Sequence, residues 1–182
     1  MKKILLVHGW GGSNFPHWQS WLAGELAKDY GQVSFIKLSN FDFPNLTLWK
    51  KELQEELTQF QPDIVISHSL ANTLWFHLCN DLTLQIVKKL YLVAPPSFTS
   101  NLTELNTFFP LELPTQTYAE KAILIGSSND PYMKVSELKE LQKSLGIKLE
   151  VIEDAGHLNA DSNYGEWPWI LEEVKKDIAN LS

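Results

Sequence analysis

The sequence contains no arginine, a single cysteine and no long hydrophobic run. All fifteen basic residues are therefore lysines, so no guanidinium group is available for bidentate binding of a phosphate or carboxylate. The formal net charge of −7 gives the chain no electrostatic attraction for a nucleic-acid backbone. With Cys79 alone, neither an intrachain disulfide nor a cysteine zinc site can form. We therefore expect no nucleic-acid partner and no metal.

Targeting and membrane-spanning segments also have no match in the sequence. The apolar run at 4–7 follows Lys2-Lys3 and stops at His8, whereas a signal peptide needs an apolar stretch of about 7–15 residues. No run approaches the roughly 18 apolar residues of a membrane span. We therefore expect a soluble, cytoplasmic protein without a membrane partner.

Short apolar runs alternate with longer amphipathic segments along the whole chain. Runs rich in Ile, Val and Leu predict six strands, at 4–7, 33–38, 64–66, 90–93, 122–125 and 147–152. The segments between them show helical spacing, as in Trp18, Leu22 and Leu26. This alternation predicts an α/β fold with a doubly wound, mostly parallel six-stranded sheet and helices on both faces. Without an internal repeat or a linker, residues 1–182 should form a single domain.

Polar residues with catalytic chemistry follow three of the predicted strands. Ser69 follows the third strand, Asp130 the fifth and His157 the sixth. The carboxyl ends of parallel strands meet at one edge of a sheet, so these side chains should lie close together. Their order along the chain is that of the α/β-hydrolases. It predicts a serine nucleophile, a histidine general base and an aspartate that orients the imidazole.

The nucleophile assignment depends on the run Ser67-His68-Ser69-Leu70-Ala71, which lies between a predicted strand and a predicted helix. A nucleophile on such a sharp turn needs small residues two positions before and after it, and glycine is usual at both. Here the two positions hold Ser67 and Ala71, which are small but are not glycine. The alternative is that Ser69 only caps the following helix.

The acid and the base both have competitors. Asp154 and Asp161 lie closer in sequence to His157 than Asp130 does. We favour Asp130, because in this chain order the acid commonly follows an earlier strand than the histidine. Among the other four histidines, His68 should lie on the face of the turn opposite to the nucleophile, by alternation. None of them matches a metal-binding spacing.

Two backbone N–H groups are expected to hold the oxyanion that forms when a carbonyl is attacked. One belongs to Leu70, at the start of the helix after the nucleophile, and the other to Trp10, in the loop after the first strand. The proline-bracketed segment 94–120 is the expected wall of the substrate pocket, although it could equally be a plain crossover between parallel strands. We expect the pocket to be lined by Trp10, Phe98, Phe108 and Phe109.

Several blocks of residues, spread from the first strand to the last helix, resemble one family. They are His8-Gly9-Trp10, His17-Trp18, Ser67-His68-Ser69-Leu70-Ala71, Ser128-Asn129-Asp130-Pro131-Tyr132, Ala155-Gly156-His157-Leu158-Asn159 and Gly165-Glu166-Trp167-Pro168. With them the chain resembles the small serine hydrolases that include retinoblastoma-binding protein 9 and the bacterial YdeN-like hydrolases. The resemblance implies a compact α/β-hydrolase fold without a large lid, hydrolysis of esters or amides and no cofactor. It also implies catalytic roles for Ser69, Asp130 and His157.

The sequence as a whole predicts a serine hydrolase that cleaves a small ester, amide or thioester through an acyl-enzyme. The expected partner is a small-molecule substrate, and the expected state is a monomer or a weak dimer. Two alternatives stay open. The chain could be an interaction module that keeps the hydrolase fold with little or no catalysis. It could also be an acyltransferase that passes the acyl group to a nucleophile other than water.

Overall fold

The structure is a computed structural model that describes residues 2–30, 32–81, 83–99 and 102–181. Its strands are β1 (Ile4–Val7), β2 (Val33–Ile36), β3 (Ile64–His68), β4 (Val87–Val93), β5 (Ala119–Ser127) and β6 (Lys148–Ile152). Its α-helices are α1 (Trp18–Tyr30), α2 (Leu46–Phe60), α3 (Leu70–Asp81), α4 (Val135–Leu145) and α5 (Pro168–Asn180). Two 3₁₀ helices, η1 (Thr103–Phe108) and η2 (Ala160–Ser162), lie in the loops.

The six strands form one sheet in the order β2-β1-β3-β4-β5-β6, and every neighbouring pair is parallel. The chain starts at β1, adds β2 on one side, and then crosses back to continue with β3 on the other side. The strand order therefore reverses between β1 and β3. In open parallel sheets such a reversal leaves a crevice at the carboxyl ends of the two strands, where ligands bind.

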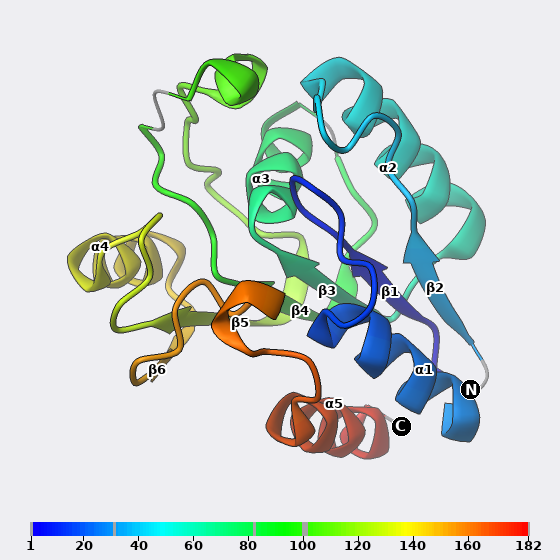
Figure 1. Ribbon diagram of the computed structural model, residues 1–182. Coiled ribbons are helices and arrows are strands. Elements are labelled where there is room, and N and C mark those ends of the chain that lie inside the picture. The colour runs from blue at the N-terminus through cyan, green and yellow to red at the C-terminus, as the bar shows by residue number, and fades with distance from the viewer. Residues whose placement is uncertain (1, 31, 82, 100–101, 182) are drawn as a thin grey trace.

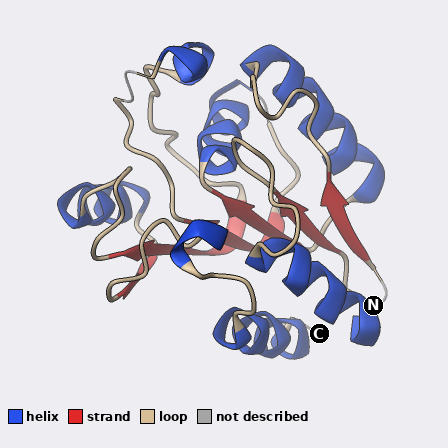
Figure 2. Cartoon of the chain, viewed as in Figure 1, coloured by secondary structure: helices blue, strands red, loops and turns tan. Residues whose placement is uncertain are grey.

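Helices cover both faces of the sheet (Figure 1). Helices α1 and α5 pack on one face, and α2, α3 and α4 pack on the other. Along β1, Leu5 and Val7 face the side of α2 and α3, while Ile4 and Leu6 face the side of α1 and α5. Strands buried on both faces read as continuous apolar runs, which is the pattern in the sequence. Figure 2 shows the strands enclosed between the two helical layers.

The predicted doubly wound α/β architecture is confirmed, and the sheet is wholly parallel rather than mostly parallel.

Two helix ends carry residues that are typical of those positions. Helix α5 begins with Pro168, whose fixed φ suits the first helical position. Helix α4 ends at Leu145 and is capped by Gly146, which adopts the left-handed conformation with φ of 64°. In the described part of the chain, no helix combines the length and the apolar character needed to cross a membrane.

Candidate active site

Ser69 occupies the sharp turn between β3 and α3. Its backbone φ is 55°, in the left-handed region that non-glycine residues rarely adopt. The turn is held because the Ser69 N–H donates to the carbonyl of Val93, at the end of the neighbouring strand β4. Such a strained strand-to-helix turn projects the side-chain hydroxyl from the edge of the sheet. The helix-cap alternative does not account for this backbone conformation.

Ser67 and Asn72 explain how the turn forms without the usual glycine. The Ser67 hydroxyl is buried and donates to Asn72 Oδ1 at 2.6 Å. The Asn72 amide in turn donates to the carbonyls of Ser69, at 2.9 Å, and Val93, at 2.8 Å. A serine side chain at position 67 is therefore satisfied by a fixed partner, and it helps to hold the carbonyl of Ser69 in place. Ala71, the other departure from glycine, is buried in the core.

A chain of hydrogen bonds connects Ser69, His157 and Asp130. Ser69 Oγ lies 2.8 Å from His157 Nε2, and His157 Nδ1 lies 2.9 and 3.1 Å from the two carboxylate oxygens of Asp130. A carboxylate only accepts, so Nδ1 carries the proton and Nε2 is free to accept the hydroxyl proton of Ser69. The backbone N–H of Tyr132 also donates to Asp130, at 2.9 Å. Asp130, rather than Asp154, is therefore the carboxylate that contacts the imidazole.

The loops that carry Asp130 and His157 are tied together by the residues just before the aspartate. Ser127 Oγ accepts the N–H of Ala155, and Ser128 Oγ accepts the N–H of Asp154. Asn129 Oδ1 accepts the N–H of Gly156 at 2.7 Å. The sequence analysis did not predict that these three side chains join the two loops. The corresponding signal in the sequence is a run of short hydrogen-bonding side chains at the end of a strand, directly before the proposed acid.

Burial keeps the surroundings of His157 free of positive charge. The side chains of His157 and Asp130 are 9% and 2% exposed. Two further imidazoles lie nearby, with the ring of His68 5.2 Å from His157 and the ring of His17 4.9 Å from His68. Burial lowers the pKa of His17 to about 4, and it holds the pKa of His68 well below the usual value. Both are therefore neutral at pH 7 and place no positive charge beside the imidazole of His157.

His68 contacts the loop that carries His157. The alternation of side chains along β3 did not predict this contact. It lies on the face of the sheet covered by α1, where its ring packs edge-on against Trp18 at 5.7 Å. The loop after β6 returns over this face, and His68 Nε2 lies 3.1 Å from the carbonyl oxygen of His157. A carbonyl only accepts, so this nitrogen donates. His68 is therefore a positioning residue for the His157 backbone.

The loop after β1 lies directly against the turn of Ser69. A Cβ on Gly9 would stand 2.8 Å from the Cβ of Ser69 and 3.0 Å from the N of Leu70, so only glycine fits. The backbone N–H groups of Trp10 and Leu70 have no acceptor among the described residues. The Leu70 N–H follows the nucleophile directly in the chain, and the Trp10 N–H follows the glycine that packs against Ser69, so both are candidate donors to an oxyanion.

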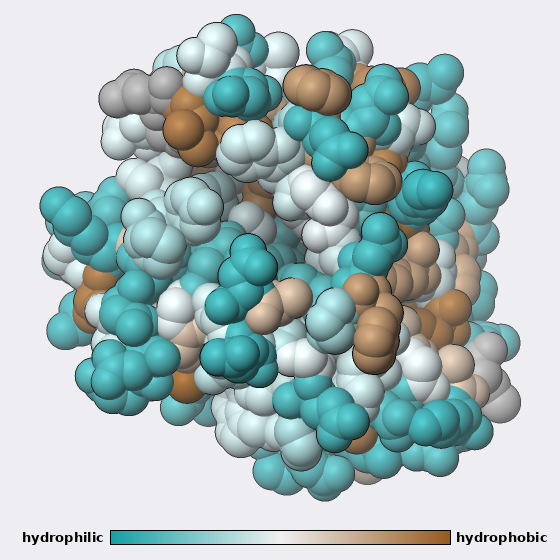
Figure 3. All heavy atoms as spheres, in the orientation of Figure 1, coloured by the Kyte–Doolittle hydropathy of each residue, from teal (hydrophilic) through white to brown (hydrophobic). Residues whose placement is uncertain are grey.

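A cavity of about 460 Å³ opens beside the Ser69 hydroxyl. Figure 3 shows the corresponding face of the molecule, which is hollowed near its centre. The cavity walls are mostly apolar and include residues of four loops and the start of α3. They are Trp10, His68, Ser69, Leu70, Pro96, Ser97, Leu102, Leu105, Pro131, Tyr132, His157, Asn159 and Asp161. A neutral organic molecule of modest size would fit this lining.

Comparison with known proteins places the chain in a family. A family described as serine hydrolase matches residues 4–176. The chain belongs to the serine hydrolase family. It is similar to YdeN of Bacillus subtilis (strain 168), which is described as a hydrolase, with 24% identity over 94% of this chain and 93% of that protein. The expected resemblance to the YdeN-like hydrolases is thereby confirmed.

Solved structures show the same fold. The crystal structure of the B. subtilis ydeN product superimposes with a TM-score of 0.83 at 22% identity, covering 98% of this chain and 100% of that one. A protein described as YdeN-like, from Pectobacterium atrosepticum, gives a TM-score of 0.74 at 21% identity over 96% and 89% of the two chains. Est1E from Butyrivibrio proteoclasticus gives 0.68 at 12% identity over 98% and 87%.

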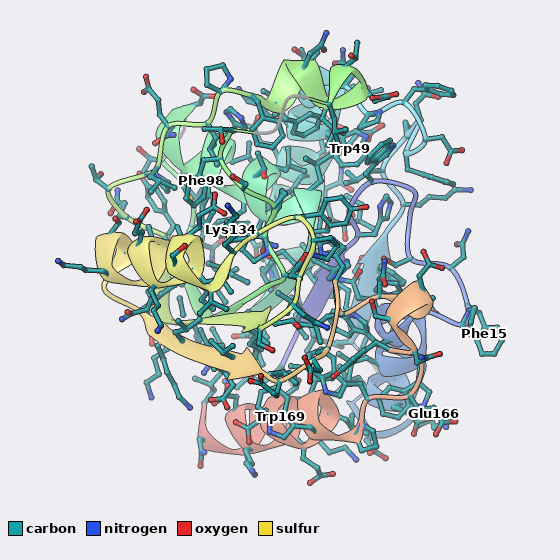
Figure 4. The ribbon with its side chains drawn as sticks, turned by 60° about the vertical axis from the view of Figure 1, so that its left-hand side comes forward. Phe15, Trp49, Phe98, Lys134, Glu166 and Trp169 are labelled. Carbon is teal, nitrogen blue, oxygen red and sulfur yellow. The ribbon has the colours of Figure 1, made fainter. Side chains whose placement is uncertain are left out.

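The phenylalanines expected to line the pocket of this serine hydrolase lie elsewhere. Phe108 is fully buried, and its ring packs edge-on against Trp49 of α2 at 5.5 Å. Phe98 and Phe109 are partly buried against the same hydrophobic core. Figure 4 labels Phe98 and Trp49. The largest apolar rings of the segment turn to the core, because burial there removes more surface from water. Segment 94–120 still forms a wall of the cavity, through Pro96, Ser97, Leu102 and Leu105.

Proposed function

We propose that this serine hydrolase cleaves a small carboxylic ester, with Ser69 as nucleophile, His157 as general base and Asp130 as the residue that orients the base. The hydrogen-bonded chain from Asp130 through His157 to Ser69, at the mouth of an apolar cavity, is the observation that carries the proposal. It supplies a polarised hydroxyl, a proton acceptor and a fixed tautomer in one place.

Acylation begins when Ser69 Oγ attacks the ester carbonyl carbon and its proton moves to His157 Nε2. The carbonyl oxygen becomes an oxyanion, which the N–H groups of Trp10 and Leu70 stabilise. Asp130 stabilises the imidazolium while remaining ionised. The intermediate collapses as the bond to the alcohol oxygen breaks, and His157 returns the proton to that oxygen. The alcohol leaves, and the acyl group stays on Ser69.

Deacylation repeats these steps with water. His157 Nε2 takes a proton from a water molecule as its oxygen attacks the acyl carbon. The second intermediate collapses when the bond to Ser69 Oγ breaks, and the proton on Nε2 passes to Oγ. The products are one carboxylic acid and one alcohol, and the enzyme regains its starting protonation state.

Labelling by a fluorophosphonate tests the proposal. The reagent reacts only with a serine that is both activated and accessible. We expect wild type to gain one adduct by intact mass, located on Ser69 by peptide mapping, and Ser69→Ala to gain none. Ser144 is exposed on helix α4, so Ser144→Ala should be labelled as wild type is. Absence of an adduct on folded wild type, or an undiminished adduct on Ser69→Ala, would contradict the assignment.

A further inference from the structure

The cavity wall contains an acidic side chain and no lysine. Among the described residues that line the cavity, Asp161 supplies the only carboxylate. None of the lysines lines the cavity, and no lysine in the described ranges forms an ion pair with Asp161. An anionic substrate would enter this cavity without a positively charged partner, which is costly.

The backbone of Asp161 is fixed relative to the loop that carries His157. It lies in η2, whose start is capped because Asn159 Oδ1 accepts both the N–H and the hydroxyl of Ser162, at 3.0 and 2.9 Å. Ser162 Oγ in turn accepts the N–H of His157 at 3.1 Å. The backbone of Asp161 is therefore held on a short helix that is hydrogen-bonded to the loop of His157. Asp161 is exposed to solvent, so the field of its carboxylate is partly screened.

Two aromatic rings on the same wall favour a cation as well. Tyr132 is 47% exposed, and its ring packs edge-on against His157 at 4.5 Å. Trp10 is 37% exposed, and its indole N–H donates to the carbonyl of Asp42, which fixes the ring at the cavity wall. The faces of such rings attract substituted ammonium groups. The cavity wall therefore presents one carboxylate and two partly exposed aromatic rings, which are groups that bind organic cations.

We propose that the preferred ester carries a compact positively charged group, such as a substituted ammonium, which Asp161, Trp10 and Tyr132 accommodate. This inference rests on the proposed esterase function and deepens it by naming the substrate class. It also predicts that esters and thioesters of anionic compounds, such as those carrying several phosphates, are poor substrates. Specificity here comes from charge, because the apolar walls accept neutral groups of the same shape.

Paired substrates of equal shape test the proposal. Acetylcholine and 3,3-dimethylbutyl acetate differ in one positive charge on the alcohol, and betaine ethyl ester and ethyl 3,3-dimethylbutanoate differ likewise on the acyl group. For each pair we compare the cation-to-neutral ratio of kcat/KM between wild type and Asp161→Asn. The intrinsic reactivities of the substrates cancel in this comparison, because both proteins hydrolyse the same pair. We expect at least one pair to show a fall of about threefold, the size usual for a solvent-exposed charge pair. The fall should shrink at high salt.

Glu166→Gln is the matched control, since it also removes one acidic group. Glu166 lies outside the cavity lining, beside α1 and α5 (Figure 4), and should leave the ratio at its wild-type value. Equal ratios in wild type and Asp161→Asn for both substrate pairs would overturn the proposal while leaving esterase activity intact.

A binding measurement separates this inference from the proposed function. Choline and 3,3-dimethylbutanol are titrated onto Ser69→Ala and onto Ser69→Ala/Asp161→Asn, and NMR chemical shifts report the affinities without any chemistry. We expect choline to bind more tightly than the neutral alcohol only when Asp161 is present. This result would support the cation site even if wild type hydrolysed no ester. Equal binding of choline by both proteins would overturn it, whatever the enzyme hydrolyses.

Discussion

Asp130 lies 27 residues before His157 in the sequence and yet contacts its imidazole through both carboxylate oxygens. Replacement with asparagine keeps the size of the side chain but adds an N–H donor where only acceptors stood. The imidazole would then favour the wrong tautomer. We predict that Asp130→Asn stays folded and loses about 10⁴-fold in kcat on an activated ester, by analogy with serine proteases. Steady-state hydrolysis, with circular dichroism as the check of folding, measures this.

Asp154→Asn serves as the matched control at this scale. Asp154 is near His157 in sequence, but its side chain makes no contact with the imidazole in the described structure. Asparagine also tolerates its left-handed backbone, with φ of 52°. This variant should hydrolyse the same ester at a rate close to that of wild type. A large loss in Asp154→Asn together with full activity in Asp130→Asn would reverse the assignment of the acid.

For individual residues, the sequence predicts the catalytic side chains better than it predicts the residues that pack around them. Ser69, Asp130 and His157 could be singled out because each follows a strand of one parallel sheet, and strand ends are brought together by topology. The contact between His68 and the loop of His157 could not be predicted. It depends on the path of the loop after β6 over the α1 face, which no local pattern encodes. The direction of Phe108 likewise depends on the position of Trp49, which lies far away in the sequence.

Among the loops, the one after β1 fits most closely against the nucleophile turn. We predict that Gly9→Ala is strongly impaired in ester hydrolysis, because its Cβ would collide with Ser69 Cβ and with the carbonyl of His68. Either Trp10 or the turn must shift, and loss of one oxyanion donor alone costs about 10²–10³ in rate. Kinetics on the purified variant measure the effect, and labelling of Ser69 shows whether the hydroxyl is still reactive.

Gly24→Ala gives the comparison for this variant. Gly24 lies inside α1, and a Cβ there would have no neighbour within 4 Å. Alanine is the better helix former, so the free energy of unfolding should rise by roughly 0.5–1 kcal/mol with activity unchanged. If Gly9→Ala matched Gly24→Ala in activity, the loop after β1 would not be held as closely as described.

At the scale of elements, the centres of the strands were predictable but some of their ends were not. Strand β1 begins and ends where its apolar run does, since it is buried on both faces. Strands β4 and β5 begin earlier than predicted, at Val87 and Ala119, and include lysines. Their pairing continues outward, with Lys89 opposite Lys121, because backbone hydrogen bonds do not require apolar side chains. The hydrophobic pattern of a sequence predicts which residues are buried. It therefore does not predict the exposed ends of paired strands.

For the whole molecule, buried neutral histidines should make stability depend on pH. His17 precedes α1, and its Nδ1 accepts the N–H of Gln19, which requires an unprotonated nitrogen. Burial, followed by the nearby His157 and His8, lowers the pKa of His17 to about 4 from the usual value of 6.5. Between these values the unfolded chain binds a proton that the folded protein does not. Stability therefore falls as pH decreases from about 6.5 towards 4, by up to ~1.4 kcal/mol per pH unit for this residue.

His17→Asn isolates this contribution, because asparagine keeps an acceptor for the Gln19 N–H and does not titrate. Urea unfolding of wild type and His17→Asn at several pH values measures the difference. We expect the free energy of unfolding of wild type to decrease more steeply than that of the variant between pH 6.5 and pH 4. Parallel curves for the two proteins would show that His17 is protonated in the folded state as readily as in the unfolded state.

In the proposed reaction, the parallel sheet of the whole molecule brings a nucleophilic Ser69 to an ester carbonyl. The most direct measurement mixes the enzyme with p-nitrophenyl acetate, quenches with acid and determines the intact mass. We predict one acetyl group on wild type, located on Ser69 by peptide mapping, released on further incubation and absent from Ser69→Ala. Rapid release of p-nitrophenol by wild type with equal turnover by Ser69→Ala would contradict it.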